Sequence, residues 1–135
     1  MEEANKMQFG EELKKRTKLF ALRIIGVVRA LPGSQEGRLM SGQIWRCGTA
    51  VGSNYRATCR SRSAKEFIAR IGVVIEEADE TLYWLEVIVE SKMLRATLLK
   101  SLIMEAEELL HIFSKSQSTA RLNLANTKKK GKNTP

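Results

Sequence analysis

Hydrophobic residues recur every three or four positions in four successive stretches of the chain, with short polar stretches between them. The four stretches run from about residue 9 to 31, from 36 to 58, from 64 to 90 and from 97 to 115. This spacing is typical of amphipathic helices that turn one face toward a common core. The residues expected on the four core faces are Phe9, Leu13, Phe20, Ile24, Val27 and Leu31; Met40, Ile44, Cys47, Val51 and Asn54; Phe67, Ile68, Ile71, Val74, Ile75, Ala78, Leu82, Leu85 and Val89; and Leu98, Leu99, Leu102, Ala106, Leu109, Leu110 and Phe113.

Local signals mark the ends of these helices. Pro32 and Gly33 follow the first stretch and end it, because both residue types interrupt helices. Ser63 and Glu66 have the spacing of a capping box, in which the serine caps the third helix and the glutamate reaches back to it. Gly48 and Gly52 lie inside the second helix, where each glycine costs about 1 kcal/mol. We therefore expect a neighbouring helix to approach closely there.

Short loops between long helices favour antiparallel neighbours. The sequence thus predicts an all-α fold, an antiparallel up-down-up-down four-helix bundle. We expect the bundle to span residues 9–118, after an N-terminal tail over residues 1–8. From about residue 116 the apolar pattern fades, and residues 119–135 are polar and basic. That composition predicts a disordered C-terminal tail.

Two of the predicted helices carry apolar residues beyond their core faces. Exposed apolar patches of this kind often mark interfaces, so we expect the protein to form a homo-oligomer. The alternative is a wide core face with a few scattered surface residues. The residues expected at the interface are Leu19, Leu22, Ile25, Val73, Glu80, Trp84, Val87 and Ile88.

The chain has 23 basic and 15 acidic residues, which gives a formal net charge of +8. Such an excess favours polyanions. Residues 71–91 contain six acids and no base, so some arginines could instead serve to hold these acids. The residues expected to contact nucleic acid are Arg38, Trp45, Arg46, Arg56, Arg60, Arg62, Lys65, Lys128, Lys129 and Lys130.

The sequence offers little for catalysis or metal binding. His111 is the only histidine and is predicted to point away from the core, with no partner group that could make it an acid or base. Cys47 and Cys59 are too far apart on one helix for a disulfide and do not have the spacing of a zinc site. We therefore expect a protein that is not an enzyme and needs no cofactor. Without a signal peptide or an apolar stretch long enough for a membrane, a cytoplasmic location is expected.

Three segments in order carry a resemblance to a known family. They are residues 43–56 (QIWRCGTAVGSNYR), residues 65–71 with 76–85 (KEFIARI and EEADETLYWL), and residues 105–110 (EAEELL). In these segments the chain resembles the bacterial four helix bundle proteins, also called 23S rRNA-intervening sequence proteins. The resemblance covers about residues 10–120 and implies a ring-like homopentamer.

Some members of that family are encoded within sequences inserted into large-subunit ribosomal RNA genes. A structurally similar accessory protein of diversity-generating retroelements binds nucleic acid and a reverse transcriptase. The resemblance therefore implies nucleic acid and a reverse transcriptase as candidate partners. The hypothesis favoured by charge is a nucleic-acid-binding oligomer, without sequence specificity because no base-reading element is evident. The alternative is a protein–protein adaptor whose basic face docks an acidic or nucleic-acid-bound partner.

Overall fold

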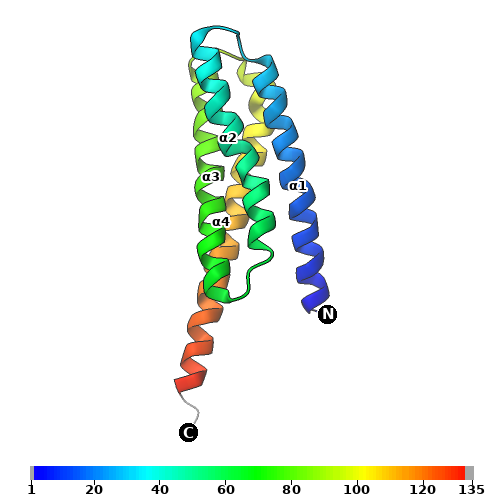
Figure 1. The fold of residues 1–135 in the computed structure, drawn as a ribbon, viewed down its shortest axis with the longest axis vertical. Coiled ribbons are helices and arrows are strands. Elements are labelled where there is room, and N and C mark those ends of the chain that lie inside the picture. Colours follow the sequence, from blue (N-terminus) through cyan, green and yellow to red (C-terminus); the bar gives the residue numbers. More distant parts are fainter. Residues whose placement is uncertain (1, 133–135) are drawn as a thin grey trace.

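The computed structural model describes residues 2–132, which form four helices (Figure 1). They are α1 (Glu2–Ala30), α2 (Gln35–Thr58), α3 (Ala64–Glu90) and α4 (Ala96–Lys132). Each helix runs antiparallel to the one before it, and α1 packs on α2, α2 on α3 and α3 on α4. This arrangement confirms the predicted all-α four-helix bundle. No helix in the described part of the chain is long and apolar enough to cross a bilayer.

Side-chain caps begin α2 and α3. The Ser34 hydroxyl accepts a hydrogen bond from the Gly37 N–H at the start of α2, and the Ser63 hydroxyl accepts one from the Glu66 N–H at the start of α3. The predicted cap at Ser63 is therefore confirmed. The Glu66 carboxylate reaches one residue further back than expected, and accepts from the Arg62 N–H at 3.1 Å. The two bonds to the serine hydroxyls satisfy N–H groups that lack partners within the helix.

The α3–α4 turn closes with a left-handed residue. Lys92 has a φ of 64°, which is uncommon for a residue other than glycine. Its N–H donates to the Val89 carbonyl, and the Met93 N–H donates to the Ile88 carbonyl. This pair of bonds is a Schellman motif, which satisfies the last carbonyls of α3.

Core residues follow a seven-residue repeat, with alternating steps of three and four positions. In α3 the fully buried side chains are Ile71, Val74, Ala78, Thr81, Leu85 and Ile88. The prediction that placed Ile88 at an oligomer interface is therefore wrong. A straight helix of 3.6 residues per turn drifts by about 20° per heptad, whereas a left-handed supercoil holds the heptad positions against the core. The supercoil thus buries Ile88 and leaves Val89 only half-buried.

Two other residues expected in the core lie at its edge. The Phe9 side chain is 47% exposed and that of Leu98 is 62% exposed. Both lie on the sides of α1 and α4 that face each other, and these two helices touch only sparsely. In α2 the buried residue is Tyr55 and not Asn54, which was predicted to face the core. The Tyr55 ring lies 5.5 Å from the Phe113 ring.

The glycines of α2 allow α1 to approach closely, as predicted. A Cβ atom on Gly48 would lie 2.7 Å from Ile24 Cγ1, and one on Gly52 would lie 3.2 Å from the Thr17 carbonyl oxygen. Both distances are shorter than ordinary van der Waals contact. The α1–α2 pair therefore depends on the absence of side chains at these two positions.

Both chain ends are more helical than predicted. Residues 2–8 belong to α1, and residues 119–132, which we expected to be disordered, continue α4 past the end of the bundle (Figure 1). These residues contain no proline and only one glycine, Gly131, so no strong helix breaker interrupts them. Residues 133–135 of the predicted tail lie outside the described residues.

Candidate nucleic-acid interface

A groove between α1 and α2 brings together four positively charged side chains. Lys14 and Lys18 come from α1, and Arg56 and Arg60 come from α2. The groove has a volume of about 370 Å³. None of the described residues that line it is acidic. The remaining lining side chains are small or carry hydroxyls, namely Ala21, Thr49, Gly52, Ser53 and Ala57.

Helix geometry explains why these cations meet. Lys14 and Lys18 are four residues apart on α1, and Arg56 and Arg60 are four residues apart on α2, so each pair lies on one helix face. The close approach at Gly52 brings the two faces together. The groove is consequently narrow, with cations on both walls and little bulk on its floor.

Most of this charge is available to a ligand. Within the described chain, Lys18, Arg56 and Arg60 form no ion pair. Lys14 lies 2.8 Å from the Glu11 carboxylate, and this contact lowers the pKa of Glu11. Three of the four cations are thus not neutralised by a direct acidic partner in the fold.

The other predicted contact residues of α2 do not join the groove. Arg38 is 18 positions before Arg56, which places it about 27 Å away along the helix. Trp45 is 47% exposed and lies between them in sequence. Arg46 is on the side of α2 that faces α3, where its guanidinium donates to Gln43 Oε1 at 2.9 Å.

The remaining predicted contact residues lie toward the end of the bundle where α2 turns into α3. Arg62 and Lys65 are exposed at this turn. Lys128, Lys129 and Lys130 are exposed on the part of α4 that extends past the same end (Figure 1). They surround the end of the bundle rather than line the groove.

The contribution of α1 to the groove was not predicted from the sequence. Residues 14–18 read KKRTK, a basic run that could have drawn attention to Lys14 and Lys18. Arg16 in the same run turns the other way and binds Glu105 and Glu108 of α4. Only the pairing of α1 with α2 distinguishes the lysines that face the groove from the arginine that does not.

The acids of α3 do not hold the predicted arginines in ion pairs. None of the six acids between residues 71 and 91 forms an ion pair with a described residue. Arg46 is near enough to lower the pKa of Glu77, but burial raises that pKa more strongly. The alternative hypothesis was that the arginines serve to hold these acids. No ion pair among the described residues of one chain supports it.

Apolar side chains are exposed on two helices that are not neighbours in the bundle. On α1, Leu19 is 57% and Leu22 is 58% exposed, and Ile25 is half-buried. On α3, Val73 is exposed, while Trp84 and Val87 are half-buried. The Trp84 indole N–H donates to Glu80 Oε1 at 3.4 Å. Apart from Ile88, the predicted interface residues thus retain accessible surface.

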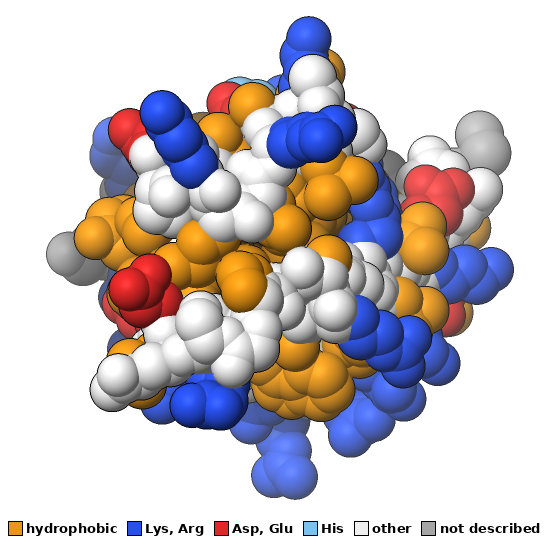
Figure 2. All heavy atoms as spheres, turned by 90° about the horizontal axis from the view of Figure 1, so that it is seen from above, with side chains coloured by type: hydrophobic (Ala, Val, Ile, Leu, Met, Phe, Trp, Pro, Cys, Tyr) orange, Lys and Arg blue, Asp and Glu red, His pale blue; other side chains and the backbone are white. Residues whose placement is uncertain are grey.

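One end of the bundle carries further apolar surface. The α1–α2 and α3–α4 turns meet there, and hydrophobic side chains gather near the centre of this end with lysines and arginines around them (Figure 2). Leu39 and Leu98 are exposed in this region.

Cys47 is buried in the core and Cys59 is exposed at the other end, and both are free thiols.

Comparisons with known proteins agree with this architecture. A crystal structure of a protein of unknown function from the S23 ribosomal protein family of Bacteroides thetaiotaomicron is similar, with a TM-score of 0.72 and 29% sequence identity over 77% of this chain and 96% of that chain. Among curated proteins, none matches the chain. The family model described as 23S rRNA-intervening sequence protein matches residues 11–115, which cover most of α1 through α4. The chain belongs to the 23S rRNA-intervening sequence protein family.

Proposed function

We propose that this protein is a non-enzymatic, homo-oligomeric nucleic-acid-binding protein, and that the α1–α2 groove receives the phosphate backbone. The observation that carries the proposal is the convergence of Lys14, Lys18, Arg56 and Arg60 on one narrow groove without an acidic residue among its described lining. Cations of this kind bind phosphates and release condensed counterions. The family description, which refers to 23S rRNA, supports RNA as one target to test.

The composition of the groove favours recognition of the backbone over recognition of bases. Its floor consists of small side chains and the hydroxyls of Thr49 and Ser53. These hydroxyls donate to carbonyls of their own helix, at Trp45 and Ala50. Contacts to phosphates position a nucleic acid but carry no sequence information. We expect binding that depends on charge and shape and varies little with sequence.

The two exposed apolar patches support assembly into a ring. α1 and α3 lie at diagonally opposite corners of the bundle, because the backbone of each is next to α2 and α4 and not next to the other. A patch on α1 that contacts a patch on α3 of the next copy makes a head-to-tail interface, which closes into a ring or continues as a filament. The Glu80 carboxylate accepts a hydrogen bond from the Trp84 indole, so the α3 patch also carries an acidic group.

Assembly would strengthen nucleic-acid binding. Each copy presents one α1–α2 groove, so a ring presents several grooves to one polyanion. Weak contacts that engage together raise the overall affinity by avidity, without any new contact. This effect links the predicted interface to the predicted ligand.

A charge-matched pair of variants tests the groove. The groove variant carries Lys14→Gln, Lys18→Gln, Arg56→Gln and Arg60→Gln. The control variant carries Arg29→Gln, Lys92→Gln, Arg95→Gln and Lys100→Gln, which remove the same charge from exposed positions outside the groove. Binding of labelled 20-nucleotide RNA, single-stranded DNA and duplex DNA is followed by fluorescence anisotropy between 50 and 300 mM salt.

We expect the groove variant to lose at least tenfold in affinity at low salt, and its salt slope on duplex to fall by about 0.9 for each lost phosphate contact. The control variant should keep most of the wild-type slope. Equal losses in the two variants would show that net charge alone drives binding. If the wild-type protein binds no nucleic acid at 50 mM salt, the proposal is wrong and the adaptor hypothesis takes its place.

Light scattering tests the assembly. Leu19→Lys with Leu22→Lys, and separately Val73→Lys, should each lower the mass of the oligomer, because they place charge in the two halves of one interface. Leu122→Lys changes an equally exposed leucine on the α4 extension and should leave the mass unchanged. A wild-type monomer, or an oligomer insensitive to both patch variants, would contradict this part of the proposal.

A further inference from the structure

A second and larger cavity opens between α1 and α4. Its volume is about 1040 Å³. Toward the middle of the bundle, polar contacts from Arg16 to Glu105 and from Arg23 to Ser101 join the two helices. Nearer the end of the bundle that carries the N-terminus, α1 diverges from α4 (Figure 1), and the described helices leave this space open.

The floor of this cavity is apolar. Phe9 and Met7 of α1, Tyr55 of α2, Phe67 and Ile71 of α3, and Ile112 of α4 line it. Phe9 has the spacing of a core residue but remains 47% exposed, because the cavity lies beside it. The α4 wall includes the small residues Ser116, Thr119 and Ala120, and also His111, Lys115 and Asn123. All four helices thus contribute to one elongated apolar space.

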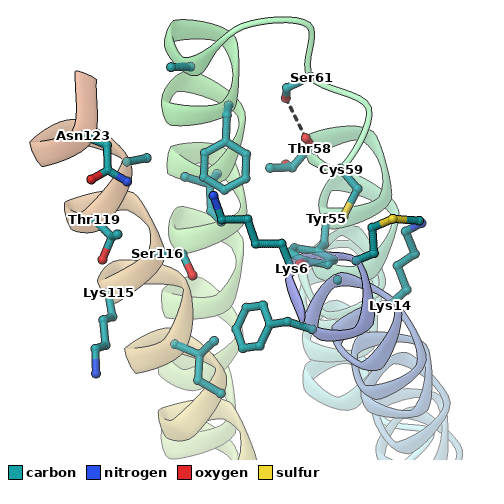
Figure 3. Close-up of a pocket in the computed structure, with 18 of the residues that line it drawn as sticks. Lys6, Lys14, Tyr55, Thr58, Cys59, Ser61, Lys115, Ser116, Thr119 and Asn123 are labelled. Carbon is teal, nitrogen blue, oxygen red and sulfur yellow. Dashed lines mark hydrogen bonds between the residues drawn. The ribbon is translucent and has the colours of Figure 1, made fainter. Parts of the chain in front are cut away.

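The charge around the cavity is positive. Figure 3 shows Lys6 extending from α1 across the cavity, whereas Lys115 points away from it. Lys6 forms no ion pair with any described residue. The single acid among the described lining residues is Glu11, whose carboxylate is held by Lys14 at 2.8 Å. The Lys6 side chain therefore crosses an apolar space, and its ammonium group has no acidic partner among the described residues.

We propose that this cavity binds one long-chain carboxylate, at a site whose described lining shares only Lys14 with the α1–α2 groove. The hydrocarbon chain packs on the aromatic and aliphatic floor, and the carboxylate pairs with Lys6. Small-molecule sites are typically apolar spaces of roughly 300–1,000 Å³ with a few polar groups that fix the orientation of the ligand. This cavity is slightly larger than the upper end of that range, and Lys6 has the sign of charge that a carboxylate requires.

Chain length and charge give the proposal a specific signature. Each methylene buried in an apolar site tightens binding by about fourfold. Isothermal titration of the delipidated full-length protein with saturated carboxylates of 8 to 14 carbons, each below its micelle concentration, should therefore show affinity that rises steeply with length. Alcohols of the same lengths should bind more weakly, because they lack the charge that pairs with Lys6.

Matched variants locate the ligand. Ala120→Trp fills the cavity and should weaken binding of the carboxylates at least tenfold, whereas Ala125→Trp lies on the exposed α4 extension outside the cavity and should have no effect. Lys6→Gln should weaken binding of the carboxylates but not of the alcohols. Lys18→Gln, in the α1–α2 groove, should change neither. Circular dichroism checks that each variant remains helical.

Two results would overturn the proposal. The first is no saturable carboxylate binding by the wild-type protein, and a change of oligomer mass in Ala120→Trp would then make the cavity an interface between copies. The second is equal binding by the Ala120→Trp and Ala125→Trp variants. Nucleic-acid binding is measured in a separate experiment, with the α1–α2 groove variant. The nucleic-acid proposal and the carboxylate proposal can therefore fail one without the other.

Discussion

Arg16 of α1 binds Glu105 of α4 through two hydrogen bonds, from Nε to Oε2 at 2.8 Å and from Nη2 to Oε1 at 2.6 Å. The same guanidinium lies 3.0 Å from the Glu108 carboxylate. The hydrogen bond to Glu105 raises the pKa of Arg16 above its ordinary value, so the guanidinium stays charged. Because α1 and α4 otherwise touch sparsely, this contact is a main direct link between them.

Arg16→Lys should therefore lower the free energy of unfolding by about 1 kcal/mol, since an ammonium group cannot reproduce the two parallel bonds of the guanidinium. Arg29→Lys changes an exposed arginine of the same helix and should stay within about 0.5 kcal/mol of wild type. Urea unfolding measures both variants. Equal stability of the two would contradict a structural role for the Arg16–Glu105 pair.

Gly48 and Gly42 provide opposite predictions on one helix. A Cβ at position 48 would lie 2.7 Å from Ile24 Cγ1, and Ile24 is fully buried and cannot move aside. Overpacking of this kind costs about 1–3 kcal/mol, so Gly48→Ala should lower the free energy of unfolding despite a better helix propensity. Gly42 has open space around its Cα, and Gly42→Ala should raise it by about 0.5–1 kcal/mol. Thermal unfolding of both variants tests the close approach of α1 and α2, and a Gly48→Ala variant more stable than wild type would disprove it.

Lys92 marks a position where the fold accepts backbone strain. Its left-handed conformation ends α3 in a motif that usually carries glycine. Lys92→Gly should raise the free energy of unfolding by about 1 kcal/mol, because glycine adopts this conformation without a steric cost. Lys100→Gly, inside α4, should lower it by about 1 kcal/mol. Chemical denaturation distinguishes the two, and destabilisation by Lys92→Gly would mean that the turn conformation differs from the one described.

Glu77 predicts a pH dependence of stability. Burial, with added repulsion from Glu80, raises its pKa above the ordinary value of 4.5, which means that folding disfavours the ionised form. The penalty is present at neutral pH and disappears as the pH falls below the pKa of the unfolded chain. Glu77→Gln should thus raise the free energy of unfolding at pH 7 by a few tenths of a kcal/mol. Denaturant unfolding between pH 3 and 7 should show this gain shrinking toward acid, and a gain that grows toward acid would contradict the assignment.

The sequence determined the number, order and approximate limits of the helices. Periodic apolar residues define each amphipathic face. Pro32 and the Ser63 cap act through their own backbone neighbours, so their effects can be inferred without knowledge of distant contacts. The need for glycine at positions 48 and 52 was also evident, because glycine inside a helix has a local cost that packing must offset.

The tertiary structure decided which faces meet and in what register. Supercoiling of packed helices moved Ile88 into the core, which a straight-helix projection could not anticipate. The pairing of α1 with α2 brought Lys14 and Lys18 beside Arg56 and Arg60, and the divergence of α1 from α4 left Phe9 beside a cavity. These features depend on contacts between residues far apart in the chain. The pattern within a helix specifies which residues seek burial, but only the packed bundle specifies the neighbours against which they are buried.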